Sequence, residues 1–252
     1  MSFEKTVGGL VLRAVSDVES VMLLGENPYE YRAVFPRELG TCELSGGDVW
    51  CFHLYSPNDG DTSVMVSGTK MHQGQTLWVH GSKQVDVEWG SGKGMLLVGS
   101  RAVGYSGSPL IKLFGRDEVK KVVKPWGYEL WLTGDPSPYF AFKRIFIKAG
   151  TKTSLQYHEK KRETNFLIEG EANLHYNPDP ATVASEFKPE NVQVERLAPG
   201  TVVDVMPMSV HRLQALTDIL LCEVSTPELD DVVRISDDSG RQDGRVESEH
   251  KV

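Results

Sequence analysis

Four side chains with metal-ligand chemistry lie in the second half of the sequence. One residue separates Gln156 from His158, Glu163 follows, and His211 comes after a Pro-Met-Ser-Val run. Alternate residues of an extended strand point to the same face, so Gln156 and His158 can face one site. Glu163 has the opposite parity and can join them only if the chain bends between residues 159 and 162. One amide oxygen, two imidazoles and one carboxylate suit a borderline divalent metal ion such as Zn, Fe, Mn or Ni.

Predicted strands supply the geometry that these ligands need. The run after Glu163 is β-prone and ends at a Glu-Gly turn signal, which predicts a strand that carries Glu163 at its start. A further strand, entered through Pro199-Gly200, would bring His211 across the sheet. Strand 139–147 alternates so that Lys143 shares one face with apolar residues, and strand 218–225 would run beside the ligands.

The order Gln-x-His, Glu, Gly, Pro, His resembles the two motifs of a cupin. Three blocks, Lys124–Glu129, Ser154–His158 and Asp231–Arg241, are similar to those of the mannose-6-phosphate isomerase type II cupins. The resemblance covers about residues 121–241. It implies an all-β chain of two cupin barrels (double-stranded β-helix or jelly-roll), that is, a bicupin.

The chain departs from that family at one ligand position. Where the family has the second histidine of His-x-His, this sequence has Lys160. The ligand set is therefore predicted to be Gln156, His158, Glu163 and His211, which resembles the zinc site of the type I phosphomannose isomerases. Zinc is accordingly the expected metal, with Fe, Mn and Ni as alternatives.

The resemblance implies interconversion of a phosphorylated aldose and ketose. In such an isomerase the metal polarises the carbonyl and the adjacent hydroxyl, and a base moves a proton between neighbouring carbons. The candidate bases are Glu223, Lys143, Lys160 or a water molecule. The arginines that could hold a phosphate are Arg162, Arg212, Arg234 and Arg241.

Two other functions stay open. A cupin that binds a carbohydrate or metabolite without turnover would keep a structural metal or none. An iron-dependent cupin dioxygenase would use a histidine-rich or facial-triad set, whereas this chain has Gln156 in the first ligand position.

Composition supports a folded, turn-rich chain. Its 252 residues are 40% hydrophobic and include 24 glycines and 13 prolines, and short strand-like runs fill residues 1–110. This predicts a degenerate cupin-like domain at 1–110, a metal-binding cupin at 111–241 and a flexible tail at 242–252. One helix is expected, at Ser16–Leu24. The three histidines of the first half lack cupin spacing, so no second metal site is predicted there.

Charge and cysteine usage narrow the partners and the compartment. A net charge of -8 argues against nucleic acid as the main partner. Three cysteines without a Cys-x-x-Cys pair, no recognisable signal peptide and no long apolar run favour a reducing cytoplasm without membrane contact. The expected partners are a small phosphorylated sugar and a second copy of the chain in a homodimer.

Overall fold

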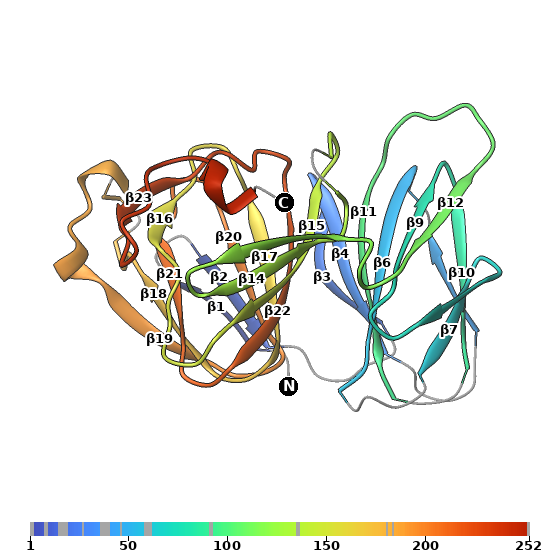
Figure 1. The fold of residues 1–252 in the computed structure, drawn as a ribbon, viewed down its shortest axis with the longest axis horizontal. Coiled ribbons are helices and arrows are strands. Elements are labelled where there is room, and N and C mark those ends of the chain that lie inside the picture. Colours follow the sequence, from blue (N-terminus) through green and yellow to red (C-terminus); the bar gives the residue numbers. More distant parts are fainter. Residues whose placement is uncertain are drawn as a thin grey trace. The chain divides into compact units, whose positions relative to one another are not determined.

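The computed structural model describes residues 3–7, 10–14, 20–26, 28–35, 41–45, 47–57, 62–90, 93–134, 137–179, 181–182 and 184–250. Throughout these residues the regular elements are β-strands and three short 3₁₀ helices, η1 Ala184–Glu186, η2 Pro189–Asn191 and η3 Glu247–His250 (Figure 1). The all-β fold class predicted from the sequence is confirmed. None of the helices in this part of the chain is long and apolar enough to cross a membrane.

The chain forms two compact units that interleave in sequence. The ligand-bearing unit consists of Met1–Ser16, Lys121–Trp131 and Lys143–Val252, and the second unit consists of Asp17–Lys120 and Leu132–Phe142. The predicted linear division at residue 110 contains no such exchange of segments.

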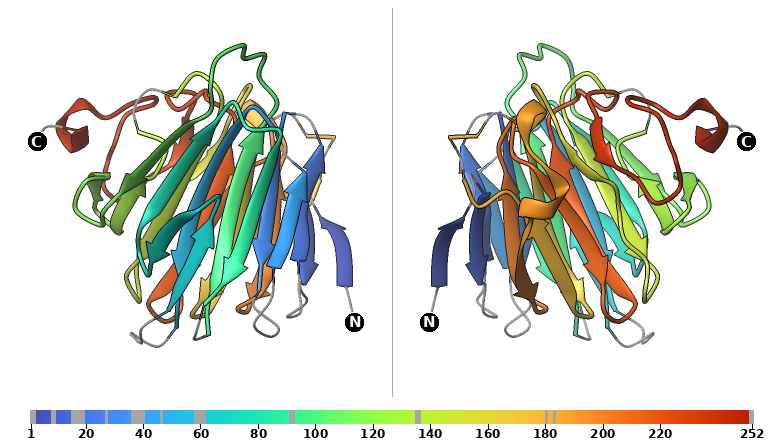
Figure 2. Two further views of the ribbon diagram at one scale, coloured as in Figure 1. Left: turned by 90° about the vertical axis from the view of Figure 1, so that its right-hand side faces the viewer. Right: turned by 90° about the vertical axis from the view of Figure 1, so that its left-hand side faces the viewer.

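Two sheets make up the ligand-bearing unit, and antiparallel strands run side by side in both (Figure 2, right). The eight-stranded sheet has the order β1-β2-β20-β17-β22-β15-β14-β13. Its strands are β1 Phe3–Val7, β2 Leu10–Ala14, β13 Lys120–Lys124, β14 Gly127–Trp131, β15 Ala141–Ile147, β17 Glu163–Glu169, β20 Thr201–Val205 and β22 Ile219–Ser225. The five-stranded sheet has the order β19-β18-β21-β16-β23. Its strands are β16 Leu155–Tyr157, β18 Ala172–Tyr176, β19 Gln193–Leu197, β21 His211–Ala215 and β23 Val233–Ser236.

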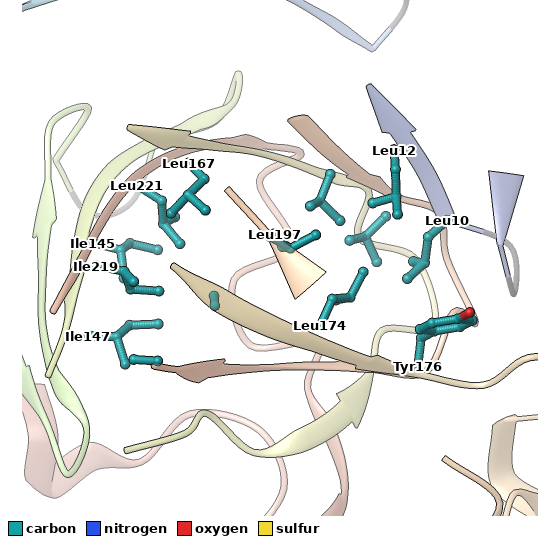
Figure 3. Close-up of a cluster of buried hydrophobic side chains, with 14 of the residues drawn as sticks. Leu10, Leu12, Ile145, Ile147, Leu167, Leu174, Tyr176, Leu197, Ile219 and Leu221 are labelled. Carbon is teal, nitrogen blue, oxygen red and sulfur yellow. The ribbon is translucent and has the colours of Figure 1, made fainter. Parts of the chain in front are cut away.

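An apolar cluster joins both sheets of this unit. Leu10 and Leu12 alternate along β2 and point into a cluster that also contains Leu174 of β18 and Leu221 of β22 (Figure 3). Leu10 is 0% and Leu12 3% exposed. Strand β2 pairs with β20, where Leu12 lies opposite Val203. Strand β2 therefore contributes to the core of the unit that carries the candidate metal ligands.

The second unit also has two sheets. One has the order β12-β9-β6-β11-β4-β3 and the other the order β5-β10-β7-β8. Their strands are β3 Ser20–Glu26, β4 Tyr29–Val34, β5 Thr41–Ser45, β6 Val49–Tyr55, β7 Ser63–Val66, β8 Thr69–His72, β9 Thr76–His80, β10 Gln84–Trp89, β11 Met95–Arg101 and β12 Leu110–Phe114.

Apolar side chains from both of these sheets fill the interior of the second unit. Trp50, Phe52 and Leu54 alternate along β6 into this cluster, which leaves His53 at a position of the opposite parity. The interior of the second unit is therefore packed with apolar side chains.

Three sequence predictions differ from the structure. The helix predicted at Ser16–Leu24 is wrong, because residues 20–26 form β3 and pair with β4. An apolar run of this length suits either a helix or a strand, and strand pairing decides between them. Residues 16–19 lie outside the described residues. Each unit is a pair of sheets rather than the closed barrel expected. The predicted flexible tail from residue 242 includes η3, whose Glu249 and His250 contact other parts of the ligand-bearing unit.

Candidate metal centre

Three predicted ligands converge inside the ligand-bearing unit. Glu163 opens β17, His211 opens β21 and His158 follows β16, so the chain bends between β16 and β17 as predicted. His158 Nε2 lies 3.5 Å from Glu163 Oε2, and His211 Nε2 lies 3.2 Å from Glu163 Oε1. One ligand atom from each residue falls within 4.8 Å of the others, and all three side chains are buried. The spacing matches a site for one metal ion.

Backbone carbonyls orient both imidazoles. His158 Nδ1 is hydrogen-bonded to the carbonyl oxygen of Asp231, and His211 Nδ1 to that of Ser209 at 2.9 Å. When Nδ1 carries the proton and donates it, Nε2 presents its lone pair, which is the arrangement found in histidines that bind metal. The His158 Nε2 atom is buried without a hydrogen-bond partner. A buried imidazole nitrogen that has no hydrogen-bond partner and lies beside a carboxylate fits a metal ligand. These residues therefore suit the divalent metal ion predicted from the sequence.

Gln156, the predicted fourth ligand, lies beside His211. It pairs directly with His211 across β16 and β21 and lines the same cavity. Its Oε1 accepts a hydrogen bond from Ser154 Oγ at 2.5 Å. That bond fixes the amide and leaves the second lone pair of the oxygen for another partner.

The bend before Glu163 is held by Asp231, a residue whose role sequence reasoning did not identify. Its carboxylate accepts hydrogen bonds from the backbone N–H groups of Glu159, Lys160 and Lys161 at 3.1, 2.6 and 2.9 Å. Burial alone would raise the pKa of Asp231, but these N–H groups lower it below the usual value. Asp231 thus positions His158 through its carbonyl and the bend through its side chain.

A row of alternating charges extends from the ligands across the eight-stranded sheet. We call Lys124, Glu129, Lys143, Glu223, Lys161 and Glu163 the charge row. Sheet order explains it, because β17, β22, β15, β14 and β13 are consecutive neighbours. Lys161 Nζ lies 2.5 Å from Glu163 Oε2 and 2.9 Å from Glu223 Oε1.

Ion pairs also connect the residues at the far end of the charge row, at longer distances. Lys143 Nζ lies 3.9 Å from Glu223 Oε1 and 3.4 Å from Glu129 Oε2, and Lys124 Nζ lies 3.9 Å from Glu129 Oε1. Trp131 Nε1 donates to Glu129 at 2.7 Å, and Lys143 lies over the Trp131 ring. Every charge in the row thus faces an opposite one.

These contacts shift the pKa values of Lys161 and Glu163. Burial opposes charge on Lys161, but the neighbouring Glu163 and Glu223 carboxylates raise its pKa above the usual value. Burial likewise opposes ionisation of Glu163, yet Lys161 and the two histidines hold its pKa well below the usual range. The Lys161 ammonium therefore stays protonated at neutral pH.

Glu129 makes the acid stability of the protein testable. Burial would raise its pKa, but Lys143, Lys124, the Trp131 N–H and Lys161 lower it from 4.5 to about 2. A depressed carboxyl pKa stabilises the fold fully above the unfolded value, and that contribution is lost as the pH falls from about 4.5 to about 2. The difference corresponds to about 3 kcal/mol. Urea unfolding from pH 5 to pH 2.5 should show a steeper loss of stability in the wild type than in Glu129→Gln.

The exposed Glu247, 76% accessible, provides the control for this experiment. Glu247→Gln should retain the steep acid dependence of the wild type. An equal slope for Glu129→Gln and wild type would contradict the depressed pKa.

The structure separates the other predicted site residues into two groups. Glu223, Lys143, Arg234 and Arg241 line the cavity that contains the ligands. Lys160 does not line it, because its side chain is exposed; at this bend the inward position belongs to Lys161, which sequence reasoning missed. The alternation of side chains along a strand was the available signal. The bend interrupts this alternation, so the sequence does not show which lysine points inward.

The remaining two arginines make structural contacts. Arg162 is paired with the buried Asp204, at 2.6 Å from Nη2 to Oδ2. Arg212 donates from Nε to the Thr153 carbonyl at 2.8 Å and contacts Asp238. Neither lines the ligand cavity, so the structure does not bring them to the place where a phosphate was expected.

The cavity has a volume of about 120 Å³. Apolar residues of β15, including Ile145 and Ile147, share its wall with the ligands and the charge row. Six basic and four acidic side chains line it: Lys124, Lys143, Lys161, Arg234, Arg241 and Arg245 against Glu129, Glu163, Glu223 and Asp230.

Comparison with known proteins places the fold. No protein-family model and no curated protein sequence matches the chain. Among solved structures, an oxalate decarboxylase from Lactobacillus farciminis, in complex with formate, is 10% identical with a TM-score of 0.59, over 93% of this chain and 86% of that one. Protein Ylba from E. coli is 12% identical with a TM-score of 0.62, over 88% and 93% of the two chains. The Bacillus subtilis oxalate decarboxylase, studied for its Mn(II) centres, is 11% identical with a TM-score of 0.57, over 93% and 77%.

These similarities define the class of structure. The chain shares the all-β fold of these solved structures. At 10–12% identity the likeness concerns the fold, and the activities of the similar proteins do not transfer with it.

Proposed function

We propose that the chain is a bicupin whose ligand-bearing unit is a metal-dependent enzyme for a small anionic substrate. The reaction we propose is proton transfer at a carbon beside a carbonyl group, as in a sugar-phosphate isomerase of the mannose-6-phosphate type. One observation carries the proposal: His158, Glu163 and His211 converge in a cavity that also contains the Lys161–Glu223 ion pair. Such a combination of metal ligands with a neighbouring acid and base is typical of catalytic rather than structural sites.

Each of the cavity residues has a separate role in the proposed reaction. Gln156, His158, Glu163 and His211 would hold the metal, which when bound would polarise the carbonyl and adjacent hydroxyl of the substrate. Zinc is the metal expected from the ligand set, and manganese, the metal of the B. subtilis oxalate decarboxylase, is the alternative from the fold. Glu223, a buried carboxylate that lines the cavity, would accept the proton. Lys161 stays protonated and donates hydrogen bonds to anionic oxygens.

The substrate class follows from the charge of the cavity. Six basic against four acidic lining residues favour a substrate with negative charge. Arg234 and Arg241 lie where a phosphate or carboxylate could be held. A small carbonyl compound that carries a hydroxyl group and one phosphate or carboxylate group would suit both the proposed proton transfer and the positive charge of the cavity.

Metal content is the first test. The protein is purified without chelator or histidine tag and analysed for zinc, manganese, iron and nickel. The wild type should retain a stoichiometric ion, and His158→Ala and Glu163→Ala should reduce retention by at least about tenfold. His175→Ala serves as a matched control, because His175 lies on β18 of the same unit and is bonded to Gln214 outside the cluster. Retention by all three variants, or by none of the proteins after metal loading, would overturn the metal centre.

Activity is tested on the metal-loaded protein in D₂O. Mannose 6-phosphate should acquire deuterium at the carbon next to its carbonyl, as followed by NMR, and Glu223→Gln should slow the exchange by about 10²–10⁴-fold. Oxalate is the comparison substrate, and formation of formate from it would point to a decarboxylase instead. A bound metal with neither reaction would leave the binding function as the better description.

One observation favours an alternative enzyme class. His158, Glu163 and His211 match the two-histidine, one-carboxylate set of non-haem iron oxygenases. Iron as the retained metal, together with oxygen uptake in the presence of substrate, would select this alternative.

A further inference from the structure

The last described turn of the chain lies against the cavity. Helix η3, Glu247–His250, follows Arg245 and Val246, which line the cavity, and His250 itself also lines it. The His250 ring meets the Trp131 ring edge-on, with centroids 5.2 Å apart. The turn is therefore seated on the end of the charge row that is farthest from Glu163 along the sheet.

Glu249 brings a carboxylate between two basic residues of that cavity. Its Oε2 lies 2.8 Å from Lys124 Nζ, and its Oε1 lies 3.5 Å from Arg241 Nη1. The three side chains are only 9–11% exposed. This is the geometry of an anion held by a lysine and an arginine, and here the anion belongs to the protein.

The two basic residues are pre-arranged independently of Glu249. Asp237 accepts hydrogen bonds from Nε and Nη2 of Arg241 at 3.0 and 2.6 Å, which leaves Nη1 directed to Glu249. Lys124 is drawn towards Glu129 at 3.9 Å. Removal of the Glu249 carboxylate would thus leave a positive site in place rather than a collapsed one.

We infer that Lys124 and Arg241 form an anion subsite of the cavity and that Glu249 is its internal occupant. The subsite takes the carboxylate or phosphate group of a small molecule, which must displace Glu249 to bind. The inference deepens the proposed function, because it names the group that the substrate carries and the contact that competes with it. The protein's apparent affinity for anions is then reduced by the fraction of molecules in which Glu249 holds the subsite.

Binding measurements on the full chain test this subsite. Inorganic phosphate and malonate are titrated by calorimetry at fixed ionic strength. Glu249→Gln should bind at least one of them about tenfold more tightly, as expected for a subsite that is about 90% self-occupied. Tightening for phosphate alone or for malonate alone identifies the preferred group. Equal affinity of Glu249→Gln and wild type for both probes would overturn the inference.

Two further variants separate the subsite from general charge effects. Glu190→Gln changes the net charge equally on an exposed turn of the same unit and should leave anion binding unchanged. Lys124→Met should weaken binding and should cancel the gain when combined with Glu249→Gln. A gain in Glu190→Gln, or a gain that persists in the Lys124→Met background, would contradict the assignment.

The same comparison in a His158→Ala background keeps the outcome independent of the metal. The gain from Glu249→Gln should persist there even if the metal proposal fails. A gain that disappears with His158 would place the anion at the metal ligands and overturn the subsite.

Discussion

Replacing Lys161 by methionine should lower the free energy of unfolding of the ligand-bearing unit by about 3–5 kcal/mol. The ammonium lies 2.5 Å from Glu163 and 2.9 Å from Glu223, and its side chain is only 5% exposed. Methionine fills a similar volume, so the loss reflects two buried carboxylates, Glu163 and Glu223, that no longer have the ammonium group that both contact. Urea unfolding at neutral pH, followed by tryptophan fluorescence in the presence of chelator, measures the effect.

The neighbouring lysine provides the control. Lys160→Met alters an exposed side chain of the same bend and should change stability by less than about 0.5 kcal/mol. Combining Lys161→Met with Glu223→Gln should recover part of the loss, because one unpaired carboxylate is removed. A loss below about 1 kcal/mol in Lys161→Met would contradict the buried ion triad.

Loss of the N-terminal leucines should destabilise the ligand-bearing unit by about 2–5 kcal/mol for each Leu→Ala change. Leu10 and Leu12 are buried in the core between the two sheets, where they face residues more than a hundred positions later in the chain. Each truncation leaves a cavity in a core that neighbouring strands can only partly close. Urea unfolding gives the magnitude, and hydrogen exchange gives the location.

Hydrogen exchange distinguishes this account from a local effect. Protection should fall in β17 and β22, which carry Glu163 and Glu223, as well as in β2 itself. Thr6→Ala on β1 is the control, since the Thr6 side chain is exposed. Loss of protection confined to residues 3–14 would show that these strands do not stabilise the rest of the unit.

The sequence allowed good prediction of local structure around the ligands. Strand β17 begins at Glu163 as the parity argument required, and Lys143, Ile145 and Ile147 share the face of β15 that lines the cavity. These predictions succeeded because alternation is a local property of a strand. The ligand roles of the four residues remain predictions that metal analysis must decide.

Contacts between distant segments were beyond the same reasoning. Nothing local indicates that Asp231 holds the bend at residues 159–161, or that β2 pairs with β20. Lys161, which lines the cavity, was not identified from the sequence for a related reason, because a bend breaks the period that assigns side chains to faces. The helix predicted at Ser16–Leu24 failed where strand pairing with β4 overrode local propensity.

The interleaving of the two units constrains how the chain can reach its native state. Strand β2 precedes its sheet partner β20 by nearly two hundred residues, and Leu132–Phe142 must join the earlier unit. Closing so long a loop is slow, so the edge of β2 that pairs with β20 lacks that partner while the intervening unit folds. A nascent chain of this kind is therefore vulnerable to aggregation during translation. A fragment that contains β2 but lacks β20 would keep this strand edge exposed.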